Sequence, residues 1–428
     1  MTPIKLFASK GASLNIGGIS IDAIIDRTGS PVYIYDAGIM RRQYRRLLSA
    51  MPKGTMIHYS IKANPNMAVV DIFRRLGAGA EVASLSELKL ALKVGFPGKK
   101  IIFAGPGKSK QEIRFAVNKR IGSINIESSN ELARVIEASE RKRGSKGPTP
   151  VALRVNLDHE VGEAGEAMIG GSRKFGIDEE YITVVLKRAM RSKAIKVTGF
   201  HCYAGTQITN SRVLAAAYKR FALWANKTAG EIGMQVETLN FGGGLGIPFG
   251  EGEMELDVDI LGSRLAAIKQ NLGKSGYFSK VRFLLEPGRY LVGPAGVYVS
   301  RVTDIKKSGG VNYVITEGGI HHALIPIVLN KNYPTAILNK MDMPSTAKCV
   351  IAGPLCSSSD QFSRMLKLPH PEIGDLVGIF NSGAYGLTAG MVYFLSHPTP
   401  AEALVEGKRL YIVRGSKRPD HGVMKRLL

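Results

Sequence analysis

The chain has few cysteines and no long hydrophobic run. Its 428 residues include three cysteines, an odd number without disulfide or metal-ligand spacing, which argues against a disulfide scaffold and a cysteine metal site. No apolar run approaches the roughly 18 residues that span a membrane, and the start MTPIKLFASKG lacks the hydrophobic stretch of a secretory signal. We therefore expect a cytoplasmic globular protein without a membrane or metal site.

Acidic residues are also scarce, with 35 against 58 basic ones and a net charge of +23. Such an excess of positive charge is typical of nucleic-acid-binding proteins, but here the basic residues are scattered along the chain. Neither a nucleic-acid-binding motif nor interleaved aromatic residues accompany them. We favour a solvated surface over a nucleic-acid site, and if there is a partner, an acidic protein is as good a candidate. The basic clusters occupy residues 41–46, 141–147, 187–193 and 417–426.

Short β-branched and apolar runs recur along the first two thirds of the chain, about 32 residues apart, which is the length of one strand–helix unit. Segments between them (67–77, 84–95, 129–139 and 178–192) show helical periodicity, several with Ser or Asp caps. Eight such units in series predict a (β/α)8 barrel. The expected strands are Met56–Ile61, Gly79–Val82, Ile101–Ala104, Ser123–Ile126, Val151–Asn156, Val197–Cys202, Glu237–Phe241 and Val281–Leu285.

After about residue 290 the pattern changes to strands without long helices between them, which predicts an all-β domain. Its expected strands lie in 295–305, 311–318, 348–353, 375–380 and 409–415. The N-terminal segment 14–25 is also strand-like, and we expect it to pair with this C-terminal sheet. The predicted fold class is thus α/β plus β, with N-terminal strands in 1–35, the barrel in 36–288 and the β domain in 289–428.

Polar residues that follow the barrel strands are the candidates for chemistry, because active sites of such barrels lie at the carboxyl ends of the strands. Lys62 ends the first strand in HYSIKANPN, and Arg154 and Asn156 end the fifth. A lysine that points into a closed cavity has a lowered pKa and a reactive amine that can form a Schiff base. A lysine whose ammonium extends to solvent is an equally good interpretation.

The loops after strands seven and eight resemble a phosphate site, since barrels of this type commonly hold phosphate there with backbone N–H groups and a guanidinium. Gly242–Gly244 follows strand seven and Arg289 follows strand eight. A glycine run is also compatible with a simple tight turn. Thr206 and Tyr385 are candidates for further hydroxyl contacts to the phosphate.

Glu286, at the end of strand eight, is suited to pair with a pyridine nitrogen, although a rim ion pair would also explain it. Tyr203 or His201 offers an aromatic face for a ring. A reactive lysine, a phosphate site, a ring partner and a carboxylate at one barrel face together predict pyridoxal 5'-phosphate.

Six motifs in order resemble the fold-type III pyridoxal-phosphate decarboxylases typified by diaminopimelate and ornithine decarboxylase. The resemblance covers about residues 30 to 405 and implies an alanine-racemase-like barrel, a β-sandwich domain and a homodimer with shared active sites. The motifs are HYSIKANPN with Lys62, GFHCYAGTQI (199–208), NFGGGLG (240–246), EPGRYLV (286–292), GPLCSSSD (353–360) and NSGAYG (381–386).

The resemblance also implies roles for single residues. Lys62 matches the Schiff-base lysine, Glu286 the pyridine partner, and Cys356 a cysteine of the neighbouring subunit that returns a proton to Cα. We take Cys202 and Cys349 as structural. A binding protein and a racemase are competing classes, but the intact lysine and glycine loop argue against the first, and the cysteine motif against the second. The implied cofactor shell is Lys62, His201, Tyr203, Thr206, Gly243, Gly244, Glu286, Arg289 and Tyr385.

Departures from the family pattern concern the substrate. Tyr203 replaces the usual ring-stacking histidine, and Ser357 stands where an acidic residue receives the distal ammonium. Ile325 and Leu329 stand where diaminopimelate enzymes carry Arg and Tyr. We therefore expect an amino acid with a masked distal end, for example a glutamyl thioester on an acidic carrier protein or a siderophore precursor. The alternative is meso-diaminopimelate, and the expected substrate-binding residues are Ser357, Asp360, His321 and His322.

Overall fold

The chain divides into two compact units. The structure, a computed structural model, describes residues 3–142, 147–158, 166–167, 174–250 and 252–418. One unit comprises Arg41–Ile247 and Met254–Leu291, and the other comprises Met1–Met40, Pro248–Glu253 and Val292–Leu428. The domain limits expected from the sequence, at 35/36 and 288/289, stay predictions.

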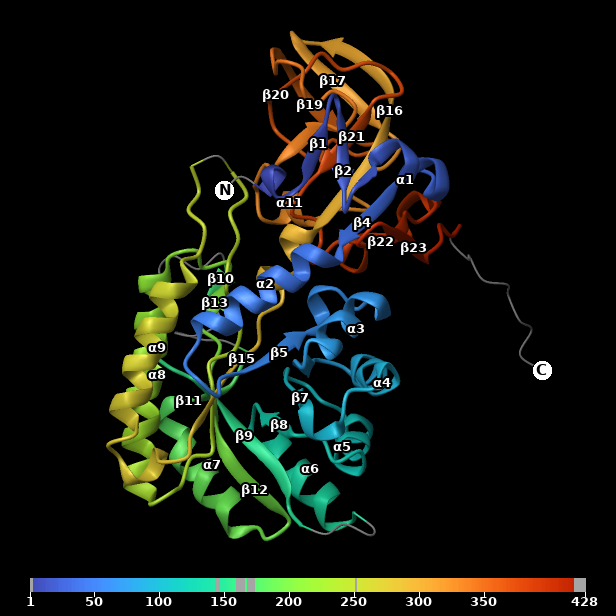
Figure 1. The fold of residues 1–428 in the computed structure, drawn as a ribbon. Helices are drawn as coiled ribbons and strands as arrows, with labels where there is room; N and C mark the ends of the chain where they lie inside the picture. Colours follow the sequence, from blue (N-terminus) through green and yellow to red (C-terminus); the bar gives the residue numbers. More distant parts are fainter. Residues whose placement is uncertain (1–2, 143–146, 159–165, 168–173, 251, 419–428) are drawn as a thin grey trace, which may run out of the picture. The chain divides into compact units, whose positions relative to one another are not determined.

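Eight parallel strands form a closed barrel in the first unit (Figure 1). They follow the order β9-β12-β14-β15-β5-β6-β7-β8, and pairing between β8 and β9 closes the ring. Every residue of β6, β7 and β8 is buried, as expected for parallel strands covered on both faces. The predicted barrel is confirmed, and its strands are β5 Met56–Ser60, β6 Gly79–Val82, β7 Ile101–Phe103, β8 Ser123–Ile126, β9 Thr149–Asn156, β12 Ile195–His201, β14 Thr238–Asn240 and β15 Arg282–Leu285.

Helices connect the barrel strands and cover their outer side (Figure 1). The Ser84 hydroxyl caps α4, so the predicted serine cap is confirmed there. Helix α6 is capped by Ser128, one residue before the predicted segment, and Asp178 at the start of α7 makes no side-chain cap bond. The helices are α2 Ala37–Ala50, which crosses the boundary between the units, α3 Met67–Arg75, α4 Leu85–Val94, α5 Lys110–Asn118, α6 Ser129–Glu140, α7 Glu179–Arg191, α8 Ser211–Ile232, α9 Val258–Leu272 and α10 Arg289–Val292. Short strands add β10 Glu166–Ala167, β11 Ile177–Asp178 and β13 Gly205–Thr206.

The second unit is built around another sheet. Its main path is β20-β19-β17-β16-β4-β22-β23, and β21 joins β16 and β18 beside that path. Each of the five predicted C-terminal segments contains a strand. The strands are β4 Val32–Asp36, β16 Gly296–Ser308, β17 Val311–Thr316, β18 Thr335–Ile337, β19 Ala347–Ala352, β20 Leu366–Leu368, β21 Leu376–Ile379, β22 Ala401–Glu406 and β23 Arg409–Arg414, with the short helix α11 Ile325–Val328.

The prediction for segment 14–25 is wrong in two respects. β2 (Ser13–Ile16) and β3 (Ile19–Ser20) pair with β1 (Ala8–Lys10) in a separate sheet, and Ile21–Thr28 forms helix α1. The Ser20 hydroxyl accepts the Ala23 N–H and starts this helix, and Ile21, Ile24 and Ile25 form its buried face. The N-terminal strand that joins the C-terminal sheet is β4, between β16 and β22.

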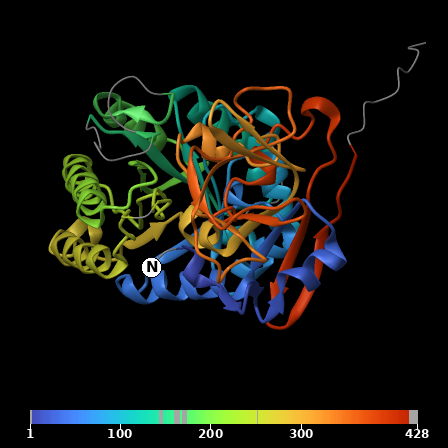
Figure 2. The same cartoon turned by 90° about the horizontal axis from the view of Figure 1, so that it is seen from above.

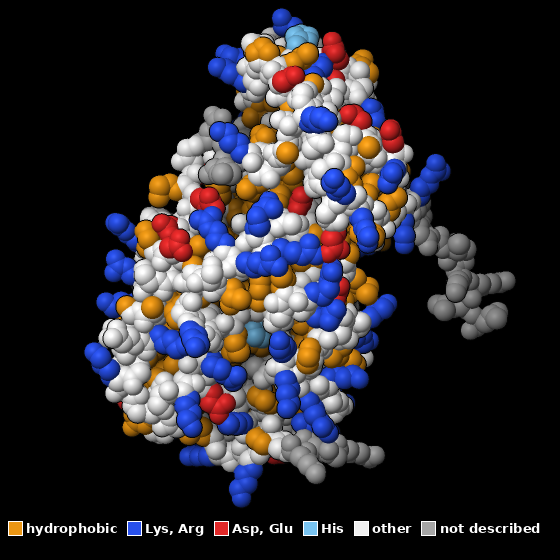
Figure 3. Space-filling model, viewed as in Figure 1, with side chains coloured by type: hydrophobic (Ala, Val, Ile, Leu, Met, Phe, Trp, Pro, Cys, Tyr) orange, Lys and Arg blue, Asp and Glu red, His pale blue; other side chains and the backbone are white. Residues whose placement is uncertain are grey.

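None of the described helices is long and apolar enough to cross a membrane. Lysine and arginine side chains spread over the whole face drawn in Figure 3, with acidic side chains at fewer places. Residues 143–146 and 419–426 of the expected basic clusters lie outside the described residues. The scattered charge predicted from the sequence is what this face shows.

Candidate active site

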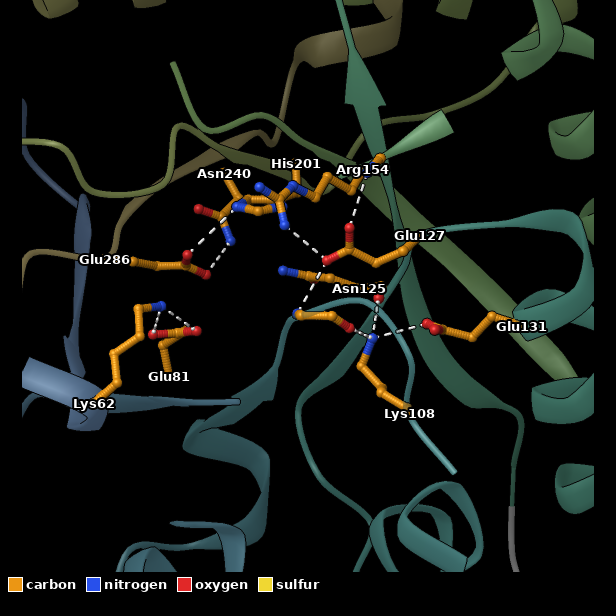
Figure 4. Close-up of polar contacts among 12 residues, drawn as sticks. Lys62, Glu81, Lys108, Asn125, Glu127, Glu131, Arg154, His201, Asn240 and Glu286 are labelled. Carbon is orange, nitrogen blue, oxygen red and sulfur yellow. Dashed lines mark hydrogen bonds and ion pairs between the residues drawn. The ribbon is translucent and has the colours of Figure 1, made fainter. Parts of the chain in front are cut away.

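Lys62 lies directly after β5, in the short turn Ile61–Ala63 at the carboxyl end of the barrel. Its Nζ donates to both carboxylate oxygens of Glu81, each at 2.9 Å, from the neighbouring strand β6 (Figure 4). Ser60 also donates to Glu81. The Glu81 side chain is 1% exposed, whereas that of Lys62 is 47% exposed. Of the two interpretations of Lys62, this geometry favours the exposed one, because the ammonium pairs with a carboxylate and the side chain remains half exposed.

Glu286 follows β15 and is buried beside Asn240 and His201. Asn240 Nδ2 donates to Glu286 Oε1 at 2.7 Å, and His201 Nε2 lies 3.4 Å from Oε2. Burial alone raises the pKa of the Glu286 carboxyl, but His201, Asn240 and Lys62 together lower it to about 2. The carboxylate is therefore ionised at neutral pH and is suited to bind a protonated ring nitrogen.

The glycine run after β14 brings two loops together. A Cβ at Gly243 would lie 2.5 Å from the Glu286 carbonyl oxygen, and one at Gly244 would lie 2.2 Å from that of Gly205. Gly244 also has a φ of +91°, which side chains rarely adopt. Only bare backbone fits here, so this loop presents main-chain groups at the barrel mouth.

The two aromatic candidates occupy different places beside this loop. The Tyr203 ring packs against the glycine run, since a Cβ at Gly242 would approach its Cδ2 to 2.7 Å. His201 is buried, faces Glu286, and its Nδ1 has no hydrogen-bond partner among the described residues. Thr206 ends β13, and Arg289 begins α10 directly after Glu286-Pro-Gly. The structure brings these residues to one end of the barrel, and their roles stay predictions.

A second polar network borders the first (Figure 4). Arg154 at β9 donates to Glu127 at 2.7 Å, and Glu127 also accepts the N–H groups of Gly105 and Gly176. Burial raises the pKa of Glu127, but Arg154 and then Lys108 outweigh it, so the pKa is lowered. Arg154 belongs to the residues singled out in the sequence, and its carboxylate partner follows β8 directly.

Sequence reasoning missed several members of this polar rim, namely Glu81, Lys108, Glu127 and Glu131. The rule that identified Lys62 would have found two of them. Glu81 lies inside the buried run GAEV, and Glu127 follows the buried run SINI. A carboxylate at the carboxyl end of an otherwise apolar strand is therefore a usable signal.

The remaining expected site residues belong to the β-sheet unit. Cys356 is exposed, and the hydroxyls of Ser357 and Ser359 lie 2.8 Å apart. Asp360 is buried, and its two carboxylate oxygens accept the N–H groups of Ile320 and Leu355, both at 2.7 Å. The Asp360 carboxylate thus joins two loops of the unit.

The histidine pair of this unit is buried. His322 bonds Tyr298 through Nδ1 and the Pro398 carbonyl oxygen through Nε2, both at 2.9 Å. Burial lowers the pKa of His321 to about 4 and that of His322 to about 3, with neighbouring histidines adding to both effects. Tyr385 is half-buried with a φ of +53°. Within the described ranges no group of three or more His, Cys, Asp or Glu residues is arranged to hold a metal ion.

Comparison with known proteins gives consistent matches along the whole chain. Residues 37–293 match the family described as "Pyridoxal-dependent decarboxylase, pyridoxal binding domain". The chain is 34% identical to the L-glutamyl-(BtrI acyl-carrier protein) decarboxylase of Niallia circulans, over 97% of both chains. It is 30% identical to the diaminopimelate decarboxylase of Archaeoglobus fulgidus, over 96% of both. The crystal structure of diaminopimelate decarboxylase from M. jannaschii with L-lysine superposes with a TM-score of 0.90 at 27% identity, covering 97% of this chain and 96% of that one.

The barrel mouth fits pyridoxal phosphate. Bare glycine backbone suits a phosphate, an ionised buried carboxylate suits a pyridinium nitrogen, and a lysine amine lies on the same rim. The buried Nδ1 of His201 adds a polar atom without a protein partner among the described residues. These groups match the three chemically distinct parts of the cofactor.

Gly244→Ala is expected to weaken pyridoxal phosphate binding at least about ten-fold, which corresponds to about 1.4 kcal/mol. The new methyl group would overlap the Gly205 carbonyl oxygen, so the loop must move. Titration of the apoprotein with the cofactor measures the change. Gly230→Ala on α8 is the matched control, because its Cβ would lie 3.6 Å from Tyr277, an ordinary contact. An equal affinity of both variants would contradict a phosphate role for the glycine run.

Proposed function

The chain belongs to the pyridoxal-dependent decarboxylase family, and we propose that it removes the α-carboxylate of an amino acid whose distal end is masked or carrier-bound. The substrate class that fits best is a glutamyl group attached as a thioester to a carrier protein. A carrier-bound glutamyl group is also the substrate in the name of the relative from Niallia circulans.

The observation that carries this proposal is the lack of a free carboxylate in the segment Cys356–Asp360. Ser357 follows the cysteine and hydrogen-bonds with Ser359. The acid of the segment, Asp360, is buried and already accepts two backbone N–H groups. A free distal ammonium would need an anionic receptor to offset its desolvation, and this segment offers hydroxyl groups instead.

A cavity of about 340 Å³ beside this segment supports the same substrate class. Its polar lining is mostly hydroxyl and amide, and the two cations that line it, Lys331 and Arg364, are engaged by Glu253 and Asn330. Such a lining suits a neutral acyl or amide chain, which needs hydrogen bonds rather than a counter-ion. The hydroxyl and amide residues are Asn330, Asn332, Ser358, Ser359, Gln361 and Ser363.

In this proposal each group at the barrel mouth has one task. When bound, pyridoxal phosphate supplies an electron sink for the electron pair that the departing carbon dioxide leaves behind. Lys62 would hold the cofactor through its amine, and Glu286 would keep the ring nitrogen protonated. Thr206, Gly243, Gly244 and Arg289 would bind the phosphate, and His201 or Tyr203 would cover the ring. The phosphate contact expected of Tyr385, which belongs to the β-sheet unit, stays a prediction.

The cysteine completes the reaction. Cys356 Sγ donates the proton that replaces the lost carboxylate at Cα. We propose that it does so from the neighbouring subunit of a homodimer, as the family resemblance implies. Its exposure in the single chain is consistent with a role toward another subunit.

Mixed dimers provide a direct check of this arrangement. Lys62→Ala and Cys356→Ala chains are each expected to lose most activity, whereas mixing and exchange should restore up to about a quarter of it. Half of the dimers are then mixed, and one of their two sites has both residues. Activity is measured as carbon dioxide release. If mixing restores nothing although mass spectrometry shows subunit exchange, the shared site is wrong.

The proposed substrate is tested with free diaminopimelate, lysine, ornithine and carrier-bound glutamate. We expect carrier-bound glutamate to give a kcat/KM at least about ten-fold above that of each free amino acid, because the free distal charges lack receptors. Carbon dioxide release from the purified protein measures each rate. Efficient turnover of free diaminopimelate would reject the proposal in favour of a diaminopimelate decarboxylase, the activity of the relative from Archaeoglobus fulgidus.

A further inference from the structure

A groove of about 380 Å³ runs along the outside of the barrel between α8 and α9. The two helices lie side by side in both Figure 1 and Figure 2. Alanines on α8 and α9, including Ala215, Ala222 and Ala267, leave space where larger side chains would fill the contact. Ile268 and Leu272 are buried at the floor. The groove therefore offers an apolar floor of a size that suits the side chains of a helix.

Cations form the rim of this groove. Arg212 and Lys219 on α8 and Arg264 on α9 line it and are exposed, and no carboxylate is among the lining residues. Within the described part of the chain none of the three forms an ion pair. Other cations of α8 do, since Arg220 pairs with Glu179 and Lys227 with Glu231. The three cations around the groove thus differ from Arg220 and Lys227, because no carboxylate of the described residues pairs with them.

Two further side chains of the groove are suited to contact a partner. Leu223 lines the groove and is 59% exposed, so its apolar side chain is available to a partner. Asn226 also lines it, and its Oδ1 is buried without a hydrogen-bond donor among the described residues. An apolar contact and a donor from a partner would satisfy both.

The groove begins at the same end of the barrel as the active site. α8 starts five residues after Thr206, and the Ser211 hydroxyl donates to the Asp257 carbonyl oxygen, which ties together the first turns of α8 and α9. From Arg212 to Asn226 the helix extends about 21 Å away from this end. A protein seated in the groove would therefore lie beside the barrel mouth.

We propose that this groove binds an acidic amphipathic helix of the carrier protein that delivers the substrate. The inference rests on the proposed function, because only a carrier-bound substrate needs a docking surface. The acidic face of the helix pairs with the three rim cations, its apolar ridge covers Leu223 and the alanine floor, and the net charge of +23 steers the encounter. A nucleic acid fits less well, since a phosphate backbone leaves an apolar floor uncovered.

Charge reversal of the rim tests the groove. The probe is an acidic acyl carrier protein loaded with a glutamyl thioester, and its binding to the full chain is followed by fluorescence anisotropy. The triple variant Arg212→Glu, Lys219→Glu and Arg264→Glu is expected to raise the Kd and the KM for this probe at least about ten-fold. Leu223→Asp is expected to raise the Kd without changing the net charge by more than one.

The matched control reverses three exposed cations of α7, Lys187→Glu, Arg188→Glu and Arg191→Glu, which changes the net charge equally. We expect the control to keep most of the affinity. Rates with a glutamyl thioester of a small thiol show whether each variant still has an intact active site. Equal loss in control and groove variants would mean unspecific attraction and would overturn the proposal.

The remaining outcomes separate the groove from the proposed function. If the groove variant decarboxylates the carrier-bound probe with an unchanged KM, the docking surface is wrong and the function stands. If the groove variant weakens binding of the probe but even the wild-type protein releases no carbon dioxide from it, the docking surface is supported and the proposed function is wrong. Binding of duplex DNA or of a second copy of this chain in place of the carrier would also overturn the proposed occupant.

Discussion

Lys62→Ala is expected to lower the decarboxylation rate at least about a thousand-fold, more than any other single change in this chain. In the proposed mechanism the amine of Lys62 would hold the cofactor aldehyde and give way to the substrate amine. Carbon dioxide release measures the loss. Borohydride reduction of the wild-type protein with pyridoxal phosphate, followed by peptide mapping, should place the label on Lys62.

The variant also leaves Glu81 buried without its cation, so lost activity needs to be separated from lost stability. Glu81 accepts hydrogen bonds from Lys62 and Ser60 and is 1% exposed. The double variant Lys62→Ala, Glu81→Gln removes the unpaired charge, and we expect it to recover stability in urea unfolding but no activity. Lys100→Ala is the matched control, because Lys100 is exposed and donates to the Gly77 carbonyl oxygen. A label on another lysine, or near wild-type rates in Lys62→Ala, would remove Lys62 from the mechanism.

The barrel could be predicted because its signal is repeated eight times. Each strand is a short buried run, and the next lies about one strand–helix unit further along the chain. Given the barrel, the rule that chemistry lies at the carboxyl ends of strands brings Lys62, His201 and Glu286 to one mouth before any coordinates are known. This prediction does not require the register between neighbouring strands, because eight parallel strands all end at the same mouth of the barrel.

Pairings across the mouth could not be predicted in the same way. Whether Glu81 reaches Lys62, or Glu127 reaches Arg154, depends on the register of neighbouring strands and on side-chain rotamers, which no single strand encodes. The N-terminal error has a local cause. Alternating apolar residues in 14–25 suggested strands, but the cap at Ser20 and the spacing of Ile21, Ile24 and Ile25 favour a helix.

Glu286→Gln is expected to lower kcat about 100- to 1000-fold while KM changes little. Glutamine has the size of glutamate and can still accept the hydrogen bond from Asn240, so the fold of the mouth is retained. The negative charge is lost, and with it the proposed partner of a protonated ring nitrogen. An unprotonated ring would stabilise the developing negative charge less well, so the substitution would affect the chemical step more than binding.

Single-turnover carbon dioxide release measures the chemical step, and the absorbance spectrum of the bound cofactor reports on the protonation of its ring. Glu237→Gln is the matched control, since Glu237 precedes β14 and pairs with Lys196 on the surface. We expect the control to keep its rate within two-fold, and Glu286→Asp to recover part of the loss because it restores the charge. If Glu286→Gln kept the wild-type rate and spectrum, the low pKa of Glu286 would reflect only its pairing with His201 and Asn240, and the ring partner would be another residue.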